Sequence, residues 1–240
     1  MTIAWILLTM NRAKAVGRTL EYNTKNAGMA WDELIWVDNG SREHEINDIV
    51  LGYNPTVCCL FKKNQGVAIG YNTAMSLARS DLIVITGCDM LMPDNWLRTF
   101  VDCFEKIPNT GVVSIYSVPC ETLPERLRGP ERIAGGITIR PAMPMGRKAF
   151  SRELLKRAGW LREDFGLYGH EDVEFGYRME RVCREKGLLS YVLPQQVPRH
   201  LGDEDPEKYR NWKLDQAKDP EKIKLLNKLI SWGHPYYSPY

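Results

Sequence analysis

The chain has 240 residues, of which 44% are hydrophobic and 26% are charged, as is typical of a globular protein. Its 32 basic and 30 acidic residues leave a net charge of only +2, which argues against a nucleic-acid binder that relies on bulk positive charge. No apolar run approaches the roughly 20 residues of a membrane-spanning helix.

The first half of the chain alternates strands and helices. Short apolar runs predict strands at residues 3–8, 33–37, 56–61 and 82–85. Helices are predicted at residues 12–26, at 69–79 and from Asp94, as N-cap, to Lys106. This alternation indicates a parallel sheet that is covered by helices on both faces.

The second half is less regular. Strands are predicted at residues 111–116, at 134–140 with entry through two glycines, and at 188–193. Ser151 is the expected N-cap of a helix that ends at Gly159, and a second helix covers residues 171–186. Residues 120–130 are predicted to form an irregular loop. The charged chain from residue 203 onward is predicted to be helical, with Asp205 and Asp219 as the N-caps of two helices.

The six cysteines form no CxxC pair and have no zinc-type spacing with histidine. The apolar stretch at residues 2–9 is too short for a signal peptide and is not preceded by basic residues. We therefore expect reduced thiols in a cytoplasmic protein, which could also associate peripherally with a membrane.

Three predicted strands end in polar residues that parallel topology would gather at one edge of the sheet. Thr9, Asn11 and Arg12 follow the first strand, Asp38 and Asn39 the second, and Asp89 the fourth. Ligands of open α/β sheets bind at this edge. An Asp there suits a nucleotide hydroxyl or a hard divalent cation, although each residue could also be a plain turn residue. The glycine-rich fingerprints of dehydrogenases and P-loop enzymes are missing.

The ordered set of motifs resembles GT-A fold glycosyltransferases of the family 2 type. The resemblance is carried by residues 9–12 (TMNR), 36–41 (WVDNGS), 64–68 (NQGVA) with Asn72, the strand that ends at Asp89, and 169–172 (GHED). It implies a nucleotide-sugar donor, most simply a UDP-sugar, a Mn²⁺ or Mg²⁺ cation, and inversion at the sugar carbon. The acceptor would be a hydroxyl of a glycan, a lipid-linked glycan, a protein or a modified nucleobase.

The resemblance also implies roles for single residues. Asp172 would be the catalytic base and Glu171 would position the acceptor, together with Gly135, Gly136 and Trp160. Asp89 and His200 would hold the metal. The nucleotide-sugar would contact Thr9, Asn11, Arg12, Asp38, Asn39, Gly66, Asn72 and Cys88. The sequence departs from the family at Gly87, which replaces the first carboxylate of the DXD motif.

Plainer interpretations remain open beside these roles. His200 could be an ordinary surface or core histidine, and the two glycines a bulge. The acidic pair could simply stabilise the start of a helix. The charged stretch at residues 203–228 could be a solvated helical face. A nucleotidyltransferase on a related fold, or a sugar-nucleotide-binding protein without catalysis, is also compatible with the sequence.

The fold class we predict is α/β, a single Rossmann-like GT-A domain with a mostly parallel central sheet. The domain covers residues 1–202, with a nucleotide-sugar-binding half at 1–116 and an acceptor-binding half at 117–202. A short helical extension follows at residues 203–240.

Overall fold

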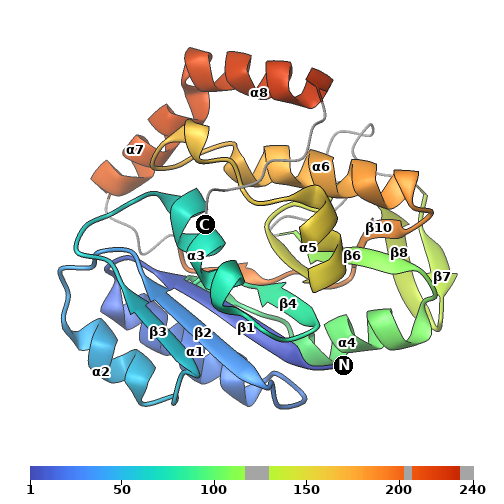
Figure 1. Ribbon diagram of the computed structural model, residues 1–240. Coiled ribbons are helices and arrows are strands. Elements are labelled where there is room, and N and C mark those ends of the chain that lie inside the picture. Colours follow the sequence, from blue (N-terminus) through green and yellow to red (C-terminus); the bar gives the residue numbers. More distant parts are fainter. Residues whose placement is uncertain (117–129, 203–206, 233–240) are drawn as a thin grey trace.

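The computed structural model describes residues 1–116, 130–202 and 207–232. Within these ranges, nine strands form one sheet in the order β3-β2-β1-β4-β9-β6-β10-β8-β7 (Figure 1). The strands are β1 (Ile3–Thr9), β2 (Glu33–Asp38), β3 (Val57–Leu60), β4 (Leu82–Ile85), β6 (Thr110–Ile115), β7 (Arg132–Ala134), β8 (Ile137–Pro141), β9 (Arg147–Ser151) and β10 (Leu189–Val192). The helices are α1 (Ala13–Lys25), α2 (Glu45–Leu51), α3 (Val67–Leu77), α4 (Trp96–Lys106), α5 (Arg152–Ala158), the 3₁₀ turn η3 (Glu163–Phe165), α6 (Glu171–Glu185), α7 (Glu207–Lys218) and α8 (Pro220–Trp232).

The α/β class and the covered sheet are confirmed. Strands β3, β2, β1 and β4 are parallel neighbours, and every residue of β1 is buried. Successive side chains point to opposite faces of a strand, so Trp5 and Leu7 pack with α1, α2 and α4, whereas Ile6 and Leu8 pack with α3, α5 and α6. Figure 1 shows these two helix layers below and above the sheet. The parallel strands therefore end together at one edge.

Strand β9 was not predicted, and it makes the sheet mixed beyond β4. It lies antiparallel between β4 and β6, with Ala149 beside Val84 and Val113. Its sequence, RKAFS, begins with two basic residues and does not resemble an apolar core strand. Ser151, which ends the strand, is the N-cap of α5 as predicted, since its Oγ accepts a hydrogen bond from Leu154 N at 3.1 Å.

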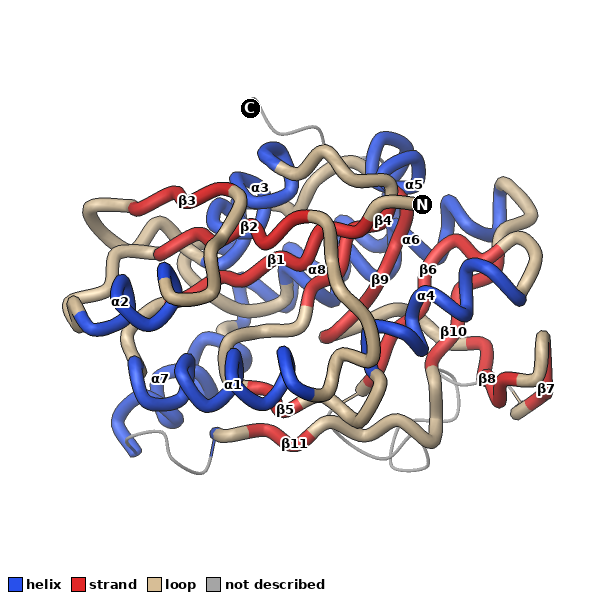
Figure 2. The backbone as a smooth tube through the Cα atoms, turned by 90° about the horizontal axis from the view of Figure 1, so that it is seen from below, coloured by secondary structure: helices blue, strands red, loops and turns tan. Residues whose placement is uncertain are grey.

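A small second sheet joins two distant segments. Strand β5 (Met90–Leu91) pairs antiparallel with β11 (Arg199–His200), so that Met90 lies opposite His200 (Figure 2). The backbone adds one more link, from Leu201 N to the carbonyl of Asp89 at 2.8 Å. Neither two-residue strand was predicted, because such short strands have no periodic pattern of their own.

Several local predictions need correction. Helix α4 begins after Asn95, which has φ 57° and makes no side-chain cap, so Asp94 is not the N-cap. Residues 134–140 are not one strand, because Gly135 and Gly136 form the turn of the β7–β8 hairpin with φ of 54° and 77°. Helix α2 was also not predicted. The loop at 120–130, apart from its last residue, and the helix start at Asp205 lie outside the described residues.

The C-terminal chain is helical as predicted, and it packs on the domain. Asp219 caps α8, accepting a hydrogen bond from Glu221 N at 3.0 Å. Within the described ranges, none of the helices combines the length and the apolar character that a membrane crossing requires.

Candidate active site

The first part of the site is a hydrogen-bonded carboxylate where β1 and β2 end. Asp38 is only 5% exposed and lies opposite Thr9 in the parallel register. Its oxygens accept hydrogen bonds from Thr9 Oγ1 at 2.8 Å, Ser41 N at 2.8 Å and Ser41 Oγ at 2.5 Å. Trp36 Nε1 in turn donates to Thr9 Oγ1 at 2.9 Å. Two of the predicted nucleotide residues therefore form one rigid unit.

The turn after β1 has an unusual backbone, with φ of 52° at Asn11 and 67° at Arg12. Asn11 is tied to the segment after β2, since Asn11 N donates to Ser41 Oγ at 2.7 Å and its Oδ1 accepts from Arg42 N at 2.7 Å. Glu43 accepts from the backbone N–H groups of Arg12 and Ala13, which gives the helix start a negative partner. We did not predict this role for Glu43, because its partners are far away in sequence.

A second loop of the predicted site is held by Asn39. Its Nδ2 donates to Asn64 Oδ1 at 3.0 Å and to Gly66 O at 3.2 Å, and its Oδ1 accepts from Gln65 N at 2.9 Å. Gly66 has φ 100°, and a Cβ there would lie 2.7 Å from the carbonyl oxygen of Gly166. Only glycine fits this close approach of the loop to the segment that precedes α6.

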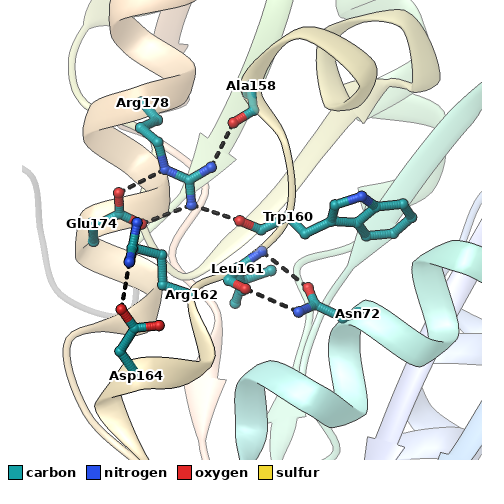
Figure 3. Close-up of polar contacts among 8 residues, drawn as sticks. All are labelled: Asn72, Ala158, Trp160, Leu161, Arg162, Asp164, Glu174 and Arg178. Carbon is teal, nitrogen blue, oxygen red and sulfur yellow. Dashed lines mark hydrogen bonds and ion pairs between the residues drawn. The ribbon is translucent and has the colours of Figure 1, made fainter. Parts of the chain in front are cut away.

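Asn72 ties α3 to the loop before the acidic pair. It is fully buried, and its amide makes two hydrogen bonds with the backbone of Leu161, from Nδ2 to Leu161 O and from Leu161 N to Oδ1, each at 2.9 Å (Figure 3). Its Nδ2 also donates to Glu163 Oε1 at 2.9 Å. These protein partners occupy both ends of the amide. A contribution to donor binding would therefore come through the position of the loop.

A buried ion pair holds the same loop from the other side. Arg178 donates to both carboxylate oxygens of Glu174, at 2.6 and 2.7 Å, and also to the carbonyls of Ala158 and Trp160 (Figure 3). Both charged side chains are 3% exposed. The ring of Trp160 points away from Arg178 in Figure 3, so only the backbone of this predicted acceptor residue is fixed by the pair.

The predicted metal residues lie together. His200 Nε2 is 3.3 Å from Asp89 Oδ2, and Arg12 Nη1 is 2.9 Å from the same oxygen. Arg12 Nη2 also donates to Leu201 O at 3.2 Å. Burial of Asp89 would raise its pKa, but the hydrogen bond from His200 and the charges of His200, Lys213 and Arg12 outweigh it and hold that pKa well below its usual range. Asp89 is therefore a carboxylate surrounded by cationic groups.

The acidic pair begins α6. Glu171 is 5% exposed, and among the described residues its Oε2 has no hydrogen-bond partner. Burial, with the charge of Asp172 adding to it, raises the pKa of Glu171 to about 7. Asp172 is half-buried beside it. A carboxyl group with a pKa near neutrality is suited to exchange a proton at working pH.

Two further residues of the site were not predicted. Lys148 on β9 is 2% exposed, and its Nζ donates to Pro144 O at 3.3 Å. Burial lowers its pKa to about 8, although the charges of Asp172 and Glu171 act against that decrease. Its position depends on β9, which sequence reasoning had not found.

Tyr71 on α3 connects the two halves of the site electrostatically. Burial raises the pKa of its phenol, and the charges of Cys88, Asp89 and Glu171 contribute to the increase. The strand end at Asp89 and the start of α6 are therefore close enough for one side chain to interact with both.

The remaining predicted site residues are Cys88, Gly135 and Gly136. Burial raises the pKa of the Cys88 thiol to about 12, so this group is neutral next to Asp89. Gly135 lies against the end of α4, where a Cβ would be 2.5 Å from Lys106 O, and no described contact joins Gly135 or Gly136 to the acidic pair. Their predicted role with the acceptor stays a prediction.

Helix α7 covers the segment that leads to the acidic pair. The ring of Tyr168 lies 5.8 Å from that of Trp212, and His170 Nε2 is 2.9 Å from Ala217 O. Lys222 Nζ donates to Tyr168 O at 2.8 Å. The extension is therefore more than a solvated helical face, because one side of it borders the candidate site.

Comparison with known proteins supports the fold. The fold resembles solved glycosyltransferases at low identity. A mannosyltransferase from Pyrobaculum calidifontis, solved with GDP-Man and Mn²⁺, matches with a TM-score of 0.64 and 20% identity, over 97% of this chain and 69% of that one. The glucosyl-3-phosphoglycerate synthase of Mycobacterium tuberculosis, solved with Mn²⁺, UDP and glucosyl-3-phosphoglycerate, gives 0.66 and 16%, over 96% and 80%. These matches define the class as GT-A fold.

The sequence itself identifies the family. The model of glycosyl transferase family 2 matches residues 4–157, and the chain belongs to this family. Two curated relatives are the chondroitin synthase of Escherichia coli, 23% identical over 80% of this chain and 34% of that protein, and the hyaluronan synthase of Pasteurella multocida, 23% identical over 88% and 26%. The chain thus spans about a quarter to a third of these relatives.

Proposed function

We propose that the chain transfers a sugar from a nucleoside diphosphate sugar to an acceptor hydroxyl. The observation that carries this proposal is the convergence, in a family 2 chain, of three groups at one edge of the sheet. They are the rigid Thr9–Asp38 unit, the Asp89–His200 pair and the acidic pair at the start of α6. A site with these three groups can hold a nucleotide, a diphosphate and an acceptor in line.

Asp38 would bind the base or ribose, with Thr9 and Asn11 in the same pocket. A UDP-sugar is the donor that we favour, because one of the GT-A neighbours was solved with UDP and Mn²⁺. The synthase names of the curated relatives favour a glycan acceptor. Residues 1–116 would bind the donor and 117–202 the acceptor.

The residues present fit a divalent cation that the protein shares with its substrate. The described residues contain no group of three metal-ligating side chains, so the protein would contribute Asp89 and His200 and the diphosphate would complete the shell. Carboxylate and imidazole are suitable ligands, and Mg²⁺ in phosphate enzymes commonly has only one or two carboxylates. When bound, the cation supplies Lewis-acid stabilisation of the leaving diphosphate.

The chemistry we assign is a single displacement that inverts the sugar carbon. The acceptor oxygen forms a bond to the anomeric carbon while the bond from that carbon to the diphosphate oxygen breaks. Asp172 takes the hydroxyl proton as general base, and Glu171 positions the acceptor. Lys148, buried beside the pair, keeps a positive charge near both carboxylates.

Product analysis tests the proposal. Purified protein is incubated with UDP- and GDP-sugars and with short glycans, with and without Mn²⁺. Release of nucleoside diphosphate supports glycosyl transfer, whereas release of pyrophosphate means nucleotidyl transfer. Tight donor binding without transfer or hydrolysis would favour the non-catalytic alternative that Gly87 suggests.

We also propose a cytoplasmic location, supported by the five free cysteines of the described ranges.

A further inference from the structure

The strand end at Asp89 carries more positive than negative charge. Arg12 from the turn after β1 and His200 from β11 both contact Asp89 Oδ2, at 2.9 and 3.3 Å. Gly87 stands where the family has another carboxylate. A third basic group, Lys213, acts on Asp89 and on Cys88 from helix α7. Without counting His200, Arg12 and Lys213 carry two positive charges against the one negative charge of Asp89, and this surplus would attract an anion.

Lys213 is held in place by aromatic rings. Its Nζ lies 4.5 Å from the ring centre of Tyr209 and 5.9 Å from that of Tyr168, and its side chain is half-buried. Cation–π contacts of this kind restrict a flexible lysine. Tyr168 precedes the acidic pair by three residues and the charge of Lys213 also acts on Asp89, so Lys213 borders both parts of the candidate site.

Helix α7 is itself fixed by contacts with the domain. The carbonyl oxygen of Ala217 lies 2.9 Å from His170 Nε2, and the ring of Trp212 packs on that of Tyr168. Gly202, the last described residue before α7, donates through its N–H to His200 Nδ1 at 2.7 Å. The position of Lys213 therefore follows from folding, and the cation is in place before a ligand arrives.

We propose that Lys213 is a diphosphate-binding residue and that α7 completes the anion site around Asp89. This inference rests on the proposed function, because it assigns the anion to the donor. Arg12 and Lys213 would face the diphosphate from two sides. Their charges would take over part of the neutralisation that a second DXD carboxylate and its cation would otherwise provide. Binding of nucleoside diphosphate should then persist without metal and weaken steeply with salt.

The test is calorimetry of UDP, GDP, ADP and CDP, then of the matching nucleoside monophosphate and nucleoside, in excess chelator. Lys213→Gln should weaken binding of the best diphosphate by about 10- to 100-fold, the range for a hydrogen bond to a charged group. The loss should be smaller for the monophosphate and absent for the nucleoside. Lys213→Arg keeps the charge and the ring contacts, and should stay within a few-fold of wild type.

Lys208→Gln is the matched control, since Lys208 is exposed and lies about 140° around the same helix. It should bind as wild type does. Unchanged diphosphate binding by Lys213→Gln would overturn this inference alone, as would an equal loss for diphosphate and nucleoside, which indicates a structural role. Wild-type protein that binds no nucleoside diphosphate, with or without Mn²⁺, would overturn the proposed function and this inference with it.

Discussion

His200 donates its Nε2 proton to Asp89 Oδ2, at 3.3 Å, because its other ring nitrogen is already used. Nδ1 accepts a hydrogen bond from Gly202 N at 2.7 Å, so the neutral ring carries its proton on Nε2. A metal ligand needs a lone pair, so for Nε2 to hold a cation between it and Asp89 the ring proton would have to move to Nδ1, at the expense of the hydrogen bond from Gly202 N. The pairing therefore orients the imidazole toward Asp89.

The first prediction concerns His200 as a metal ligand. His200→Ala should bind Mn²⁺ more weakly than wild type in the presence of nucleoside diphosphate, because one of the two protein ligands is lost. His44→Ala, at an exposed position before α2, is the control. Both are followed by Mn²⁺ titration with electron paramagnetic resonance. Identical titrations for His200→Ala and wild type would remove His200 from the metal site.

The second prediction separates the nucleotide role of Asp38 from its structural role. Asp38→Asn should weaken nucleotide binding about tenfold or more, because a lost hydrogen bond can leave a buried partner unpaired at about 1–3 kcal/mol. Ser41→Ala removes the Oγ donor to the same carboxylate but keeps the Ser41 N–H donor and the charge of Asp38, so it should destabilise the fold and affect affinity less. Calorimetry and thermal unfolding are measured for both. Equal affinities for Asp38→Asn and wild type would contradict the assignment.

The third prediction concerns the loop before the acidic pair. Asn72→Ala would leave the buried N–H and carbonyl of Leu161 without their partner, and should reduce the free energy of unfolding by about 1–3 kcal/mol. Ser76→Ala, on the exposed side of the same helix, should have little effect. Urea unfolding gives both values. An Asn72→Ala variant as stable as wild type would show that the hydrogen bonds of Asn72 are not needed to hold the loop.

The prediction of the fold succeeded where the pattern is local. Strand 82–85 and the Ser151 cap were found correctly, because an apolar run and a capping residue carry their own signal. Strand β9 was not found, because its first residues are basic and its burial comes from two neighbours distant in sequence. The same limit explains why Lys148, on that strand, was not recognised as part of the site.

The candidate residues that lie in sequence motifs could be named from the sequence, and those outside the motifs could not. Asp38, Asp89 and the acidic pair each lie in a sequence motif, and the resemblance to a glycosyltransferase family indicated that these motifs belong to one site. Glu43, Lys148 and Lys213 belong to no motif, and a charged residue on a helix is usually solvated. Only the folded chain shows that α7 turns back over Tyr168, since its contacts join segments far apart in sequence.

The fourth prediction is a pH dependence of stability. The pKa of Glu171 is raised to about 7 in the folded protein from an ordinary value near 4.5. Between these values the folded state binds more protons than the unfolded state, so stability from this group is present below pH 4.5 and is lost as pH rises through 7. Glu171→Gln should therefore match wild type at about pH 4.5 and be more stable at pH 8, by at most ~3 kcal/mol.

Melting temperatures between pH 4.5 and 8 test this expectation. A constant difference between Glu171→Gln and wild type across the range would show that Glu171 does not titrate there.

The last prediction assigns the base. Asp172→Asn keeps the shape of the side chain and removes its basicity, so kcat should fall by about 10²–10⁴-fold while donor affinity changes little. Glu171→Gln should reduce kcat less and raise the acceptor KM more, because its assigned role is to position the acceptor. Both variants are compared in steady-state kinetics and in donor calorimetry.

The kinetics can contradict the role assigned to either residue. If Asp172 only stabilises the start of α6, its Asn variant should lose a few tenths to about 1 kcal/mol of stability and keep its turnover. If Glu171, whose pKa is near neutrality and whose Oε2 has no hydrogen-bond partner among the described residues, is itself the base, Glu171→Gln should show the larger loss of kcat. The acid limb of the wild-type pH–rate profile would then lie near pH 7, because the base must be ionised to accept the acceptor proton.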